Sequence, residues 1–411
     1  SGSLESMDKI SDYGKVAKAV SASIAQNINV SLININSSDY GFEPDEENNR
    51  ILYGMKAIGG INAEIIDKIK SGRPYNGIKD FMNRCPLNKT AMISLIKSGA
   101  FDECESVLET REHIMGYYIY CSCGFKSKIN LQNFSALISC NLIPEELEYQ
   151  KRVYLFTKAL KKTSKIGDKF YITLSNVEAL EEYLPNEVFS NIQIKSDRGY
   201  ILQSIWEKYY QSQMDIVRKW LKEHHDEILD KYNHFLFMEM WKKYATGTKS
   251  HWEIETLGFY HSEHELTNID TQKYRIENFN NLRDNDVDKI YKKGKAEIPI
   301  YNLHRIAGTV IAKDDNRHLV TLLTSTGVVS VKFNRDYYSI YKQQISEVQS
   351  DGTKKIIEKG WFTRGQMLLV TGYKRDDTFV AKTYKSTNSH QLYKIVEVNG
   401  RDIQLTHDRA S

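Results

Sequence analysis

The chain has 411 residues, of which 41% are hydrophobic, so it is long enough for roughly two to four domains with ordinary folded cores. Its formal net charge of +3 excludes a strongly basic nucleic-acid tail, and any nucleic-acid surface must therefore be local. The 5 cysteines include no CxxC pair, which favours reduced thiols over a disulfide framework. No run approaches the roughly 18 consecutive apolar residues of a membrane span, so we expect a soluble, cytoplasmic protein without membrane contact.

The N-terminal part of the chain has helical patterning. Residues 8–29 are predicted to form a helix, because apolar residues recur there at helical spacing, and the apolar run 30–35 is predicted to be extended. Short helices are predicted at 61–70 and 88–98, the second beginning behind Asn88 as a cap. The architecture expected here is helical and compact.

A short turn joins two helical patterns and consists of Gly59, Gly60, Ile61 and Asn62. In a helix-hairpin-helix, such a turn points its backbone N–H groups outwards and holds a DNA phosphate without contacting bases. Asn62 occupies the second glycine position and is expected in the left-handed conformation, which asparagine tolerates. Ile58 and Ile61 are expected to hold the turn against the core. The alternative is an ordinary helix corner capped by glycine, and these residues alone leave both possibilities open.

The rest of the chain changes from helical to strand-like patterning. Residues 104–250 are mostly helical in pattern, with aromatic-rich helices predicted between 200 and 244 and a strand-like segment at 169–177. After about residue 300, β-branched runs separated by turns predict a five-stranded OB-fold, with a helical insert at 339–348 between its third and fourth strands. We therefore expect a multidomain α+β chain that is mostly helical in its N-terminal two-thirds and ends in an OB-fold β-barrel.

The barrel region is locally basic, since residues 301–411 contain 17 lysines and arginines against 11 acidic residues. OB-folds bind single-stranded nucleic acid through cations that follow the phosphates and aromatic rings that stack on bases. The predicted contact residues are Lys332, Phe333, Arg335, Lys374 and Arg375, with Trp361 and Phe362 as further stacking candidates. The alternative for Phe333 is core packing, and charged hairpin tips are common without any ligand.

Three segments carry a family resemblance. Residues 49–103, which include ILYGMKAIGG and SGAFDE, closely resemble the bacterial C-family replicases, the DNA polymerase III alpha subunits. The segment INSSDYGF at 35–42 resembles the element that closes the fingers domain of that family, although the prolines usual before it are absent. The segment IETLGFYHSEHEL at 254–266 is similar to the family's LGFY landmark, with Glu265 in place of a proline.

The resemblance implies a division of the chain. It predicts the end of a fingers domain at 1–48, a helix-hairpin-helix domain at 49–103, a divergent, mainly helical region at 104–250, a connector with the LGFY element at 251–299, an OB-fold at 300–390 and a C-terminal strand or tail at 391–411. The hairpin departs from the family pattern at two residues, because Gly59 stands in place of the usual lysine and Asn62 stands in place of the second glycine. Lys56 is a candidate to supply the displaced charge.

The resemblance also implies a function. The chain would be the C-terminal, template-handling portion of a replicative DNA polymerase, in which the hairpin grips duplex DNA and the barrel holds the single-stranded template. Nucleotidyl transfer needs paired carboxylates that hold Mg²⁺, and this family carries them in a palm domain upstream of the fingers. Asp284, Asp286 and Asp288 alternate, but no apolar strand surrounds them, so we expect a solvated turn or helix start there.

We therefore expect no catalytic residue, metal or cofactor in this chain. Alone it would be inactive, and it would need the upstream palm and fingers portion as its partner. The divergent region and the altered landmarks favour a phage-borne enzyme over a cellular one. The alternative is a stand-alone, non-catalytic DNA-binding or clamp-associated replication protein built from the same modules.

One further segment is similar to a partner-binding peptide. Residues 150–156, QKRVYLF, resemble the sequence by which such subunits bind a sliding clamp, with Gln150 bonding to backbone while Leu155 and Phe156 fill an apolar pocket. The alternative, which we favour, is a helix across 144–162 whose burial would hide this peptide.

Overall fold

The computed structural model describes residues 13–163, 165–294, 296–348, 354–384 and 390–409. The chain forms two compact units. The main unit combines Ser1–Tyr118 with Thr246–Ser411, and the inserted unit, Ile119–Ala245, interrupts it in the sequence. The inserted unit falls inside the predicted region 104–250, whose first residues belong to the main unit.

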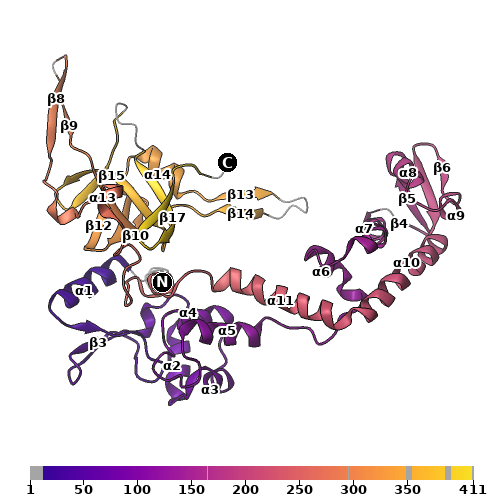
Figure 1. The fold of residues 1–411 in the computed structure, drawn as a ribbon, viewed down its shortest axis with the longest axis horizontal. Helices are drawn as coiled ribbons and strands as arrows, with labels where there is room; N and C mark the ends of the chain where they lie inside the picture. Colours follow the sequence, from indigo (N-terminus) through magenta and orange to yellow (C-terminus); the bar gives the residue numbers. More distant parts are fainter. Residues whose placement is uncertain (1–12, 164, 295, 349–353, 385–389, 410–411) are drawn as a thin grey trace, which may run out of the picture. The chain divides into compact units, whose positions relative to one another are not determined.

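The main unit begins with a helix and a small sheet (Figure 1). The helix α1 spans Tyr13–Ala25, and the expected helical residues 8–12 lie outside the described part of the chain. The sheet has the strand order β1-β3-β2, with β1 and β3 parallel; its strands are β1 (Asn29–Val30), β2 (Glu43–Asp45) and β3 (Arg50–Leu52).

A helical module follows this sheet. It contains α2 (Ala63–Ser71), α3 (Gly77–Arg84), α4 (Lys89–Lys97) and α5 (Arg111–Ser122). The predicted helices 61–70 and 88–98 correspond to α2 and α4. The segment before the glycine turn is not the expected helix, because Arg50–Leu52 pairs in the sheet and only Met55–Ala57 forms a short 3-10 turn.

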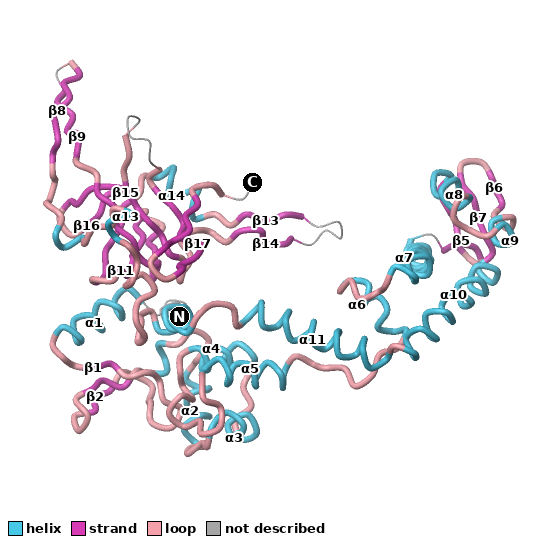
Figure 2. Tube along the Cα trace, viewed as in Figure 1, coloured by secondary structure: helices cyan, strands magenta, loops and turns pink. Residues whose placement is uncertain are grey.

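The C-terminal part of the main unit contains a closed five-stranded barrel, which Figure 2 shows as a group of magenta strands. Its strands are β10 (His304–Asp314), β11 (Leu319–Thr324), β12 (Gly327–Lys332), β15 (Met367–Arg375) and β16 (Thr378–Ala381). They pair in the order β10-β11-β12-β16-β15, and β15 pairs back with β10 to close the barrel. Only the β12–β16 pairing within this barrel is parallel. Apolar side chains such as Val331, Leu368 and Phe379 fill its interior.

Additional elements surround the barrel. Helix α14 (Arg335–Lys342) lies between the third and fourth barrel strands in sequence, and β17 (Leu392–Asn399) and β18 (Asp402–Thr406) extend the sheet beyond β15. Two separate hairpins are formed by β8 (Val287–Lys293) with β9 (Ala296–Tyr301) and by β13 (Ile345–Val348) with β14 (Lys354–Glu358). The helical insert predicted at 339–348 is therefore only half correct, because residues 345–348 pair as a strand.

A connector reaches the barrel through short helices. Helix α12 spans Lys249–Leu257 and ends at Gly258, which adopts the left-handed conformation with φ 76°. Helix α13 spans Thr271–Tyr274. The left-handed cap explains the glycine of the LGFY segment, because a residue with a Cβ is strained at this position.

The inserted unit combines helices with one antiparallel sheet. Its strands pair in the order β4-β5-β7-β6; they are β4 (Lys165–Ile166), β5 (Lys169–Thr173), β6 (Gln193–Lys195) and β7 (Arg198–Leu202). Its helices are α6 (Phe134–Ser139), α7 (Glu148–Thr163), α8 (Leu174–Glu181), α9 (Asn186–Phe189), α10 (Gln203–Glu223) and α11 (His225–Tyr244).

The sequence predictions for this unit hold in outline. The strand expected at 169–177 ends at Thr173 and continues as α8, and the long helical stretch consists of α10 and α11 separated at His224. Among the helices of the described residues, none is both long and apolar enough to cross a membrane.

Candidate nucleic-acid interface

The glycine turn between β3 and α2 has the geometry of a tight hairpin. Gly60 has φ 86°, which strongly favours glycine, whereas Asn62 has φ −100° and ψ 174°. The prediction of a left-handed Asn62 is therefore wrong. Its side chain instead caps α2, since its Oδ1 accepts the backbone N–H of Ile65 at 2.9 Å.

Buried isoleucines anchor the turn, and Gly59, Gly60 and Asn62 are exposed. Ile58 and Ile61 are 1% and 5% exposed, so both anchor the turn in the core as expected. The Ile61 amide bonds back to the Ile58 carbonyl at 3.2 Å. Within the described residues, the amides of Gly59, Gly60 and Asn62 make no backbone hydrogen bond. These donors, at the N-terminus of α2, are suited to an anionic ligand.

Lys56 adds a positive charge beside the turn. It lies in the 3-10 turn and is exposed, with its Nζ 4.9 Å from the centre of the Tyr40 ring. Lys56 stays a candidate to supply the charge displaced from position 59. Glu64 in the first turn of α2 acts in the opposite direction on an anion.

The INSSDYGF segment supports the first arm of the hairpin. The amides of Met55 and Lys56 donate to the carbonyls of Asp39 and Tyr40 at 2.9 and 3.0 Å. A Cβ added to Gly54 would lie 2.4 Å from the backbone carbon of Gly41. Glycine at position 54 thus allows two backbone segments to touch, which fixes the direction from which the chain enters the turn.

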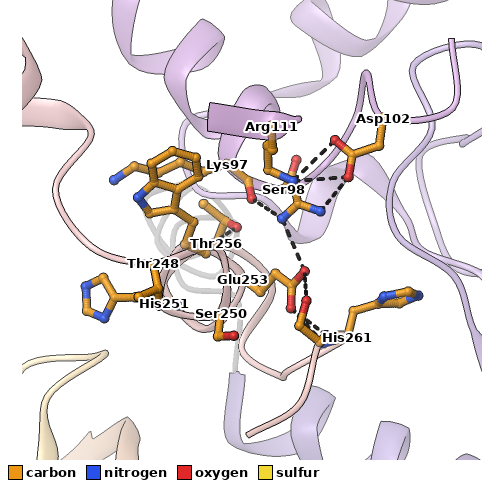
Figure 3. Close-up of polar contacts among 12 residues, drawn as sticks. Lys97, Ser98, Asp102, Arg111, Thr248, Ser250, His251, Glu253, Thr256 and His261 are labelled. Atoms are coloured by element: carbon orange, nitrogen blue, oxygen red, sulfur yellow. Dashed lines mark hydrogen bonds and ion pairs between the residues drawn. The ribbon is translucent and has the colours of Figure 1, made fainter. Parts of the chain in front are cut away.

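A buried polar cluster connects the helical module to α12, and we call it the polar joint (Figure 3). Its centre is Arg111, whose side chain is 1% exposed. The Arg111 guanidinium contacts Asp102 at 2.6 Å and Glu253 at 3.2 Å, and it donates to the Lys97 carbonyl at 3.1 Å. Residues of the GAFD segment and of α12 therefore share one cation.

The carboxylate of Glu253 is fully engaged in this joint. It accepts the backbone N–H groups of His261 and Ser262 at 3.0 and 2.7 Å, and the Ser262 hydroxyl at 3.0 Å. A buried carboxylate with several donors avoids the desolvation cost that an unpaired one would carry. The glycine of GAFD is required here, because Gly99 has φ 80° and its added Cβ would lie 2.6 Å from Arg111 Nη2.

The LGFY segment also connects the helical module to the barrel. The Tyr53 hydroxyl donates to the Leu257 carbonyl at 2.6 Å, and its ring stacks on Phe259 with centroids 5.6 Å apart. On the barrel side, Tyr260 and Thr309 share a hydroxyl hydrogen bond of 2.9 Å. The LGFY segment thus contacts the hairpin side through Tyr53 and the barrel through Thr309.

His264 completes the connection as a neutral side chain. Its Nε2 lies 2.9 Å from the Leu323 carbonyl, which can only accept, and its Nδ1 accepts the Leu266 amide at 3.0 Å. These partners assign the proton to Nε2. Burial lowers the pKa of His264, because the charged form would lose its hydration.

The aromatic residues predicted to stack on bases in the barrel lie instead in its core. Phe333, Trp361 and Phe362 are all 2% exposed or less. The Trp361 indole N–H is occupied by Glu358 at 2.6 Å. Core packing therefore accounts for Phe333, because strand alternation and barrel closure point it inwards.

The predicted cations of the barrel point in different directions. The Lys332 ammonium bonds to the Arg317 carbonyl, and Arg335 is exposed at the start of α14. The Lys374 Nζ atom lies 4.8 Å from the centroid of the Phe279 ring, whereas the guanidinium of the neighbouring Arg375 donates to the Tyr373 hydroxyl at 2.8 Å. Consecutive strand residues face opposite sides, so the pair cannot form one patch.

Tyr301, Tyr373 and Tyr384 form an aromatic cluster beside the barrel that was not predicted. The rings of Tyr301 and Tyr373 stack with centroids 3.9 Å apart and an interplanar angle of 5°. The Tyr384 hydroxyl accepts the Tyr301 amide at 2.8 Å, and Arg375 lies 5.5 Å from the Tyr373 ring. A cavity of about 460 Å³ adjoins it, lined by residues that include Tyr291, Tyr301 and Tyr384. The high tyrosine content was the only sequence signal, since these residues are far apart in the chain.

The clamp-like peptide lies inside a helix. Gln150 is 8% exposed on α7 and its side-chain amide donates to Gln213 at 3.1 Å. Phe156 packs against the core of the inserted unit, whereas Leu155 is 44% exposed. The helical alternative describes this segment.

Two of the alternating aspartates have structural partners, and the third, Asp288, lies on β8, so the expected turn or helix start is wrong at that residue. Asp284 accepts the Asp376 amide at 2.6 Å, and Asp286 accepts the Asn302 side chain at 3.1 Å. In the part of the chain that the structure describes, no group of three or more His, Cys, Asp or Glu is placed to hold a metal ion.

Comparison with known proteins gives these segments a context. Residues 27–112 match the family model described as a helix-hairpin-helix motif, which confirms the prediction that the chain contains such a motif. The chain is 35% identical over 413 aligned residues to "Probable DNA polymerase YorL" of Bacillus subtilis (strain 168), covering 97% of this chain and 31% of that protein. The "DNA-directed DNA polymerase" of Bacillus phage SPbeta is equally similar, with the same coverage. The chain therefore spans about a third (31%) of the length of the curated relatives it matches.

Proposed function

We propose that this chain is the C-terminal, DNA-holding portion of a replicative DNA polymerase of the C-family alpha-subunit type. The observation that carries the proposal is the 35% identity to proteins named as DNA polymerases across 97% of the chain. Nucleotidyl transfer would take place in a palm domain outside this chain, whose carboxylates would hold Mg²⁺. The residues described here would hold and orient the DNA.

The hairpin turn would hold duplex DNA. The amides around Gly60 would bind a phosphate, the exposed ammonium of Lys56 would add positive charge, and neither kind of group reads a base. Contacts of this kind fix the position of a protein on DNA without sequence preference, which a replicative polymerase requires.

The barrel would be an OB-fold that holds the single-stranded template. The strand order β10-β11-β12-β16-β15, with closure onto β10 and α14 between the third and fourth strands, supports this assignment. Of the predicted contacts, Lys332, Arg335, Lys374 and Arg375 remain candidates for phosphates, and Phe333 is not available for stacking. Tyr301 and Tyr384, which are only partly buried, are the aromatic residues that we propose in its place, while Tyr373 is 4% exposed and supports the Tyr301 ring from the core.

The polar joint would connect the duplex-binding hairpin turn to the template-binding barrel. Arg111 and Glu253 fix α12 against the helical module, and the chain that follows α12 contacts the barrel through Tyr260 and His264. A rigid connection would hold the duplex and the template at a constant separation during synthesis.

A binding experiment tests the hairpin. Gly60→Val places a β-branched residue at φ 86° and should reduce the affinity for a short duplex about tenfold, by disturbing the amides that meet the phosphate. Gly400→Val is the matched control, because Gly400 also has positive φ (61°) and open space around its Cβ. Equal duplex affinity of both folded variants would contradict the hairpin's role.

An activity experiment tests the polymerase assignment. Primer extension should require both this chain and a polypeptide that carries the upstream palm and fingers of the same enzyme. The log of the DNA affinity should also fall linearly with the log of the salt concentration. Extension by the upstream polypeptide alone, at an unchanged rate and processivity, would contradict the assignment.

A further inference from the structure

The sheet of the inserted unit has one buried and one open face. Along β5 and β7, Phe170, Ile172 and Ile201 are buried, whereas the residues between them are half-buried or exposed. This period of two is the pattern of an antiparallel sheet that is covered on one side only. The covered side packs against α7, α8 and α10 through Leu160, Val177 and Trp206.

Gly199 shows how closely the helices approach the covered side. A Cβ at this position would lie 2.7 Å from the Val177 side chain of α8. The strand β7 therefore uses a glycine at its centre, where a helix needs to touch the sheet.

Two tyrosines occupy the centre of the open face. Tyr171 on β5 and Tyr200 on β7 are directly opposite in the strand register, and their ring centroids are 6.1 Å apart. The Lys169 Nζ atom lies 4.5 Å from the centroid of the Tyr200 ring, and the Arg198 Cζ atom lies 5.7 Å from the centroid of the Tyr171 ring. Each ring is therefore accompanied by a cation that is diagonal to it across the strand pair.

The whole open face is positive or uncharged. By the strand register it consists of Ile166, Lys169, Tyr171, Thr173, Gln193, Lys195, Arg198, Tyr200 and Leu202. All of these residues are described, and none of them is acidic. The nearest carboxylate in the ion pairs is Asp197 in the β6–β7 turn, 3.5 Å from Arg198 Nε and largely exposed.

We propose that this face binds single-stranded DNA, as a third contact beyond the hairpin and the barrel. The rings of Tyr171 and Tyr200 would stack on successive bases, while Lys195 and Arg198 would neutralise the phosphates. Paired aromatic rings on the central strands of an open sheet, with flanking cations, are the combination by which sheet platforms hold single strands. An acidic peptide would use the cations but would leave the two central rings without a role.

The test uses the whole 411-residue chain and photocrosslinking to a short oligo(dT) in which thymine is replaced by 5-iodouracil. Crosslinked peptides are identified by mass spectrometry, so the site is located independently of any contact at the barrel. We expect crosslinks within 169–173 or 198–202. Their presence without barrel crosslinks would support this face and contradict the barrel proposal, so the two proposals fail separately.

Substitutions then measure how much the tyrosines and the cations of the open face contribute to oligo(dT) binding. Tyr171→Ala with Tyr200→Ala should abolish these crosslinks and weaken oligo(dT) binding about tenfold or more, because two stacking partners are lost. Tyr171→Phe with Tyr200→Phe keeps the rings and should bind nearly as well as the native chain. Lys195→Gln with Arg198→Gln changes only exposed residues and should also reduce binding, which keeps the test valid if the alanine variant fails to fold.

A charge-matched control separates this face from general electrostatics. Lys219→Gln with Lys231→Gln removes two exposed cations from α10 and α11 in the same unit and should leave binding unchanged. Equal losses in both charge-neutralised pairs would overturn the proposal. So would the absence of crosslinks at 169–202, or displacement of oligo(dT) by poly-glutamate at equal charge, which would assign the face to an acidic protein.

Discussion

The DNA contacts proposed for the hairpin turn and for the barrel differ in how their groups are assembled. The contact proposed at the hairpin consists of backbone amides of neighbouring residues, and their direction follows from a few local torsion angles such as φ 86° at Gly60. The contact proposed at the barrel consists of side chains from separate strands, and strand alternation separates neighbours such as Lys374 and Arg375. A site made of consecutive backbone groups can be located from sequence, whereas a site made of side chains from several strands depends on closure and register.

The largest effect is expected at the polar joint, on which the relation between these two regions depends. Arg111→Met should lower the free energy of unfolding by about 3–5 kcal/mol, because it leaves the buried carboxylate of Glu253 without its cation. Urea unfolding followed by circular dichroism measures the loss. Arg317→Met, at a side chain that is 77% exposed, is the control and should stay within about 0.5 kcal/mol. A loss below about 1 kcal/mol for Arg111→Met would show that the joint is replaceable.

A smaller effect is expected where the hairpin is supported by close backbone contact. Gly54→Ala should destabilise by about 1–3 kcal/mol, since the new Cβ would meet the Gly41 backbone at 2.4 Å. Gly41→Ala is a matched control in the same contact, because its Cβ would have nothing within 4 Å. The same thermal or urea unfolding experiment compares the two. Similar stabilities would mean that the arm of the hairpin adjusts freely.

Substitution of Asn62 separates folding from DNA binding. Asn62→Ala should cost about 1 kcal/mol through loss of the helix cap, while Asn62→Asp should keep the cap and weaken duplex binding through charge repulsion. Asn88→Asp is the control, because Asn88 caps α4 in the same way by accepting the Ala91 amide at 2.9 Å. Duplex affinity measured at two salt concentrations distinguishes these variants. Equal affinity of the Asn62→Asp and Asn88→Asp variants would place the phosphate elsewhere.

The smallest effect is a pH dependence at the barrel side of the connection. Burial lowers the folded-state pKa of His264 below its ordinary value of 6.5, so in acid the unfolded chain binds a proton that the folded chain does not. The stability that this residue contributes is therefore present above about pH 6.5 and is lost as the pH falls towards the folded-state pKa. Unfolding measured at pH 7.5 and pH 5.5 should show a smaller drop in His264→Gln than in the native chain. An equal drop in both would assign the pH dependence to other groups.

Several features could be predicted because the local sequence dictates them. Apolar spacing located α2, α4, α10 and α11, and the β-branched runs located the barrel strands. The glycine turn was located because only a few residue types adopt its torsion angles. The resemblance carried by GAFD and LGFY located the two sides of the polar joint, although not the contact between them.

Other features depended on which segments met in space. The segment before the glycine turn does not form the predicted helix, because part of it pairs in a sheet and part of it bonds to Asp39 and Tyr40. Residues 345–348 likewise form a strand instead of the predicted helix, because they pair with β14. Local propensity is weak compared with such tertiary contacts.

The sequence by itself determined where helical patterning gives way to strands, the position of the glycine turn and the basic character of the barrel region. Only the tertiary structure decided that Phe333 is core, that Arg111 joins GAFD to α12, and that Tyr171 and Tyr200 stand together on an open sheet face. The physical reason is range. Backbone torsions and apolar periodicity act over a few residues, whereas burial, ion pairing and aromatic contact act between residues that are distant in the chain and become neighbours only when it folds.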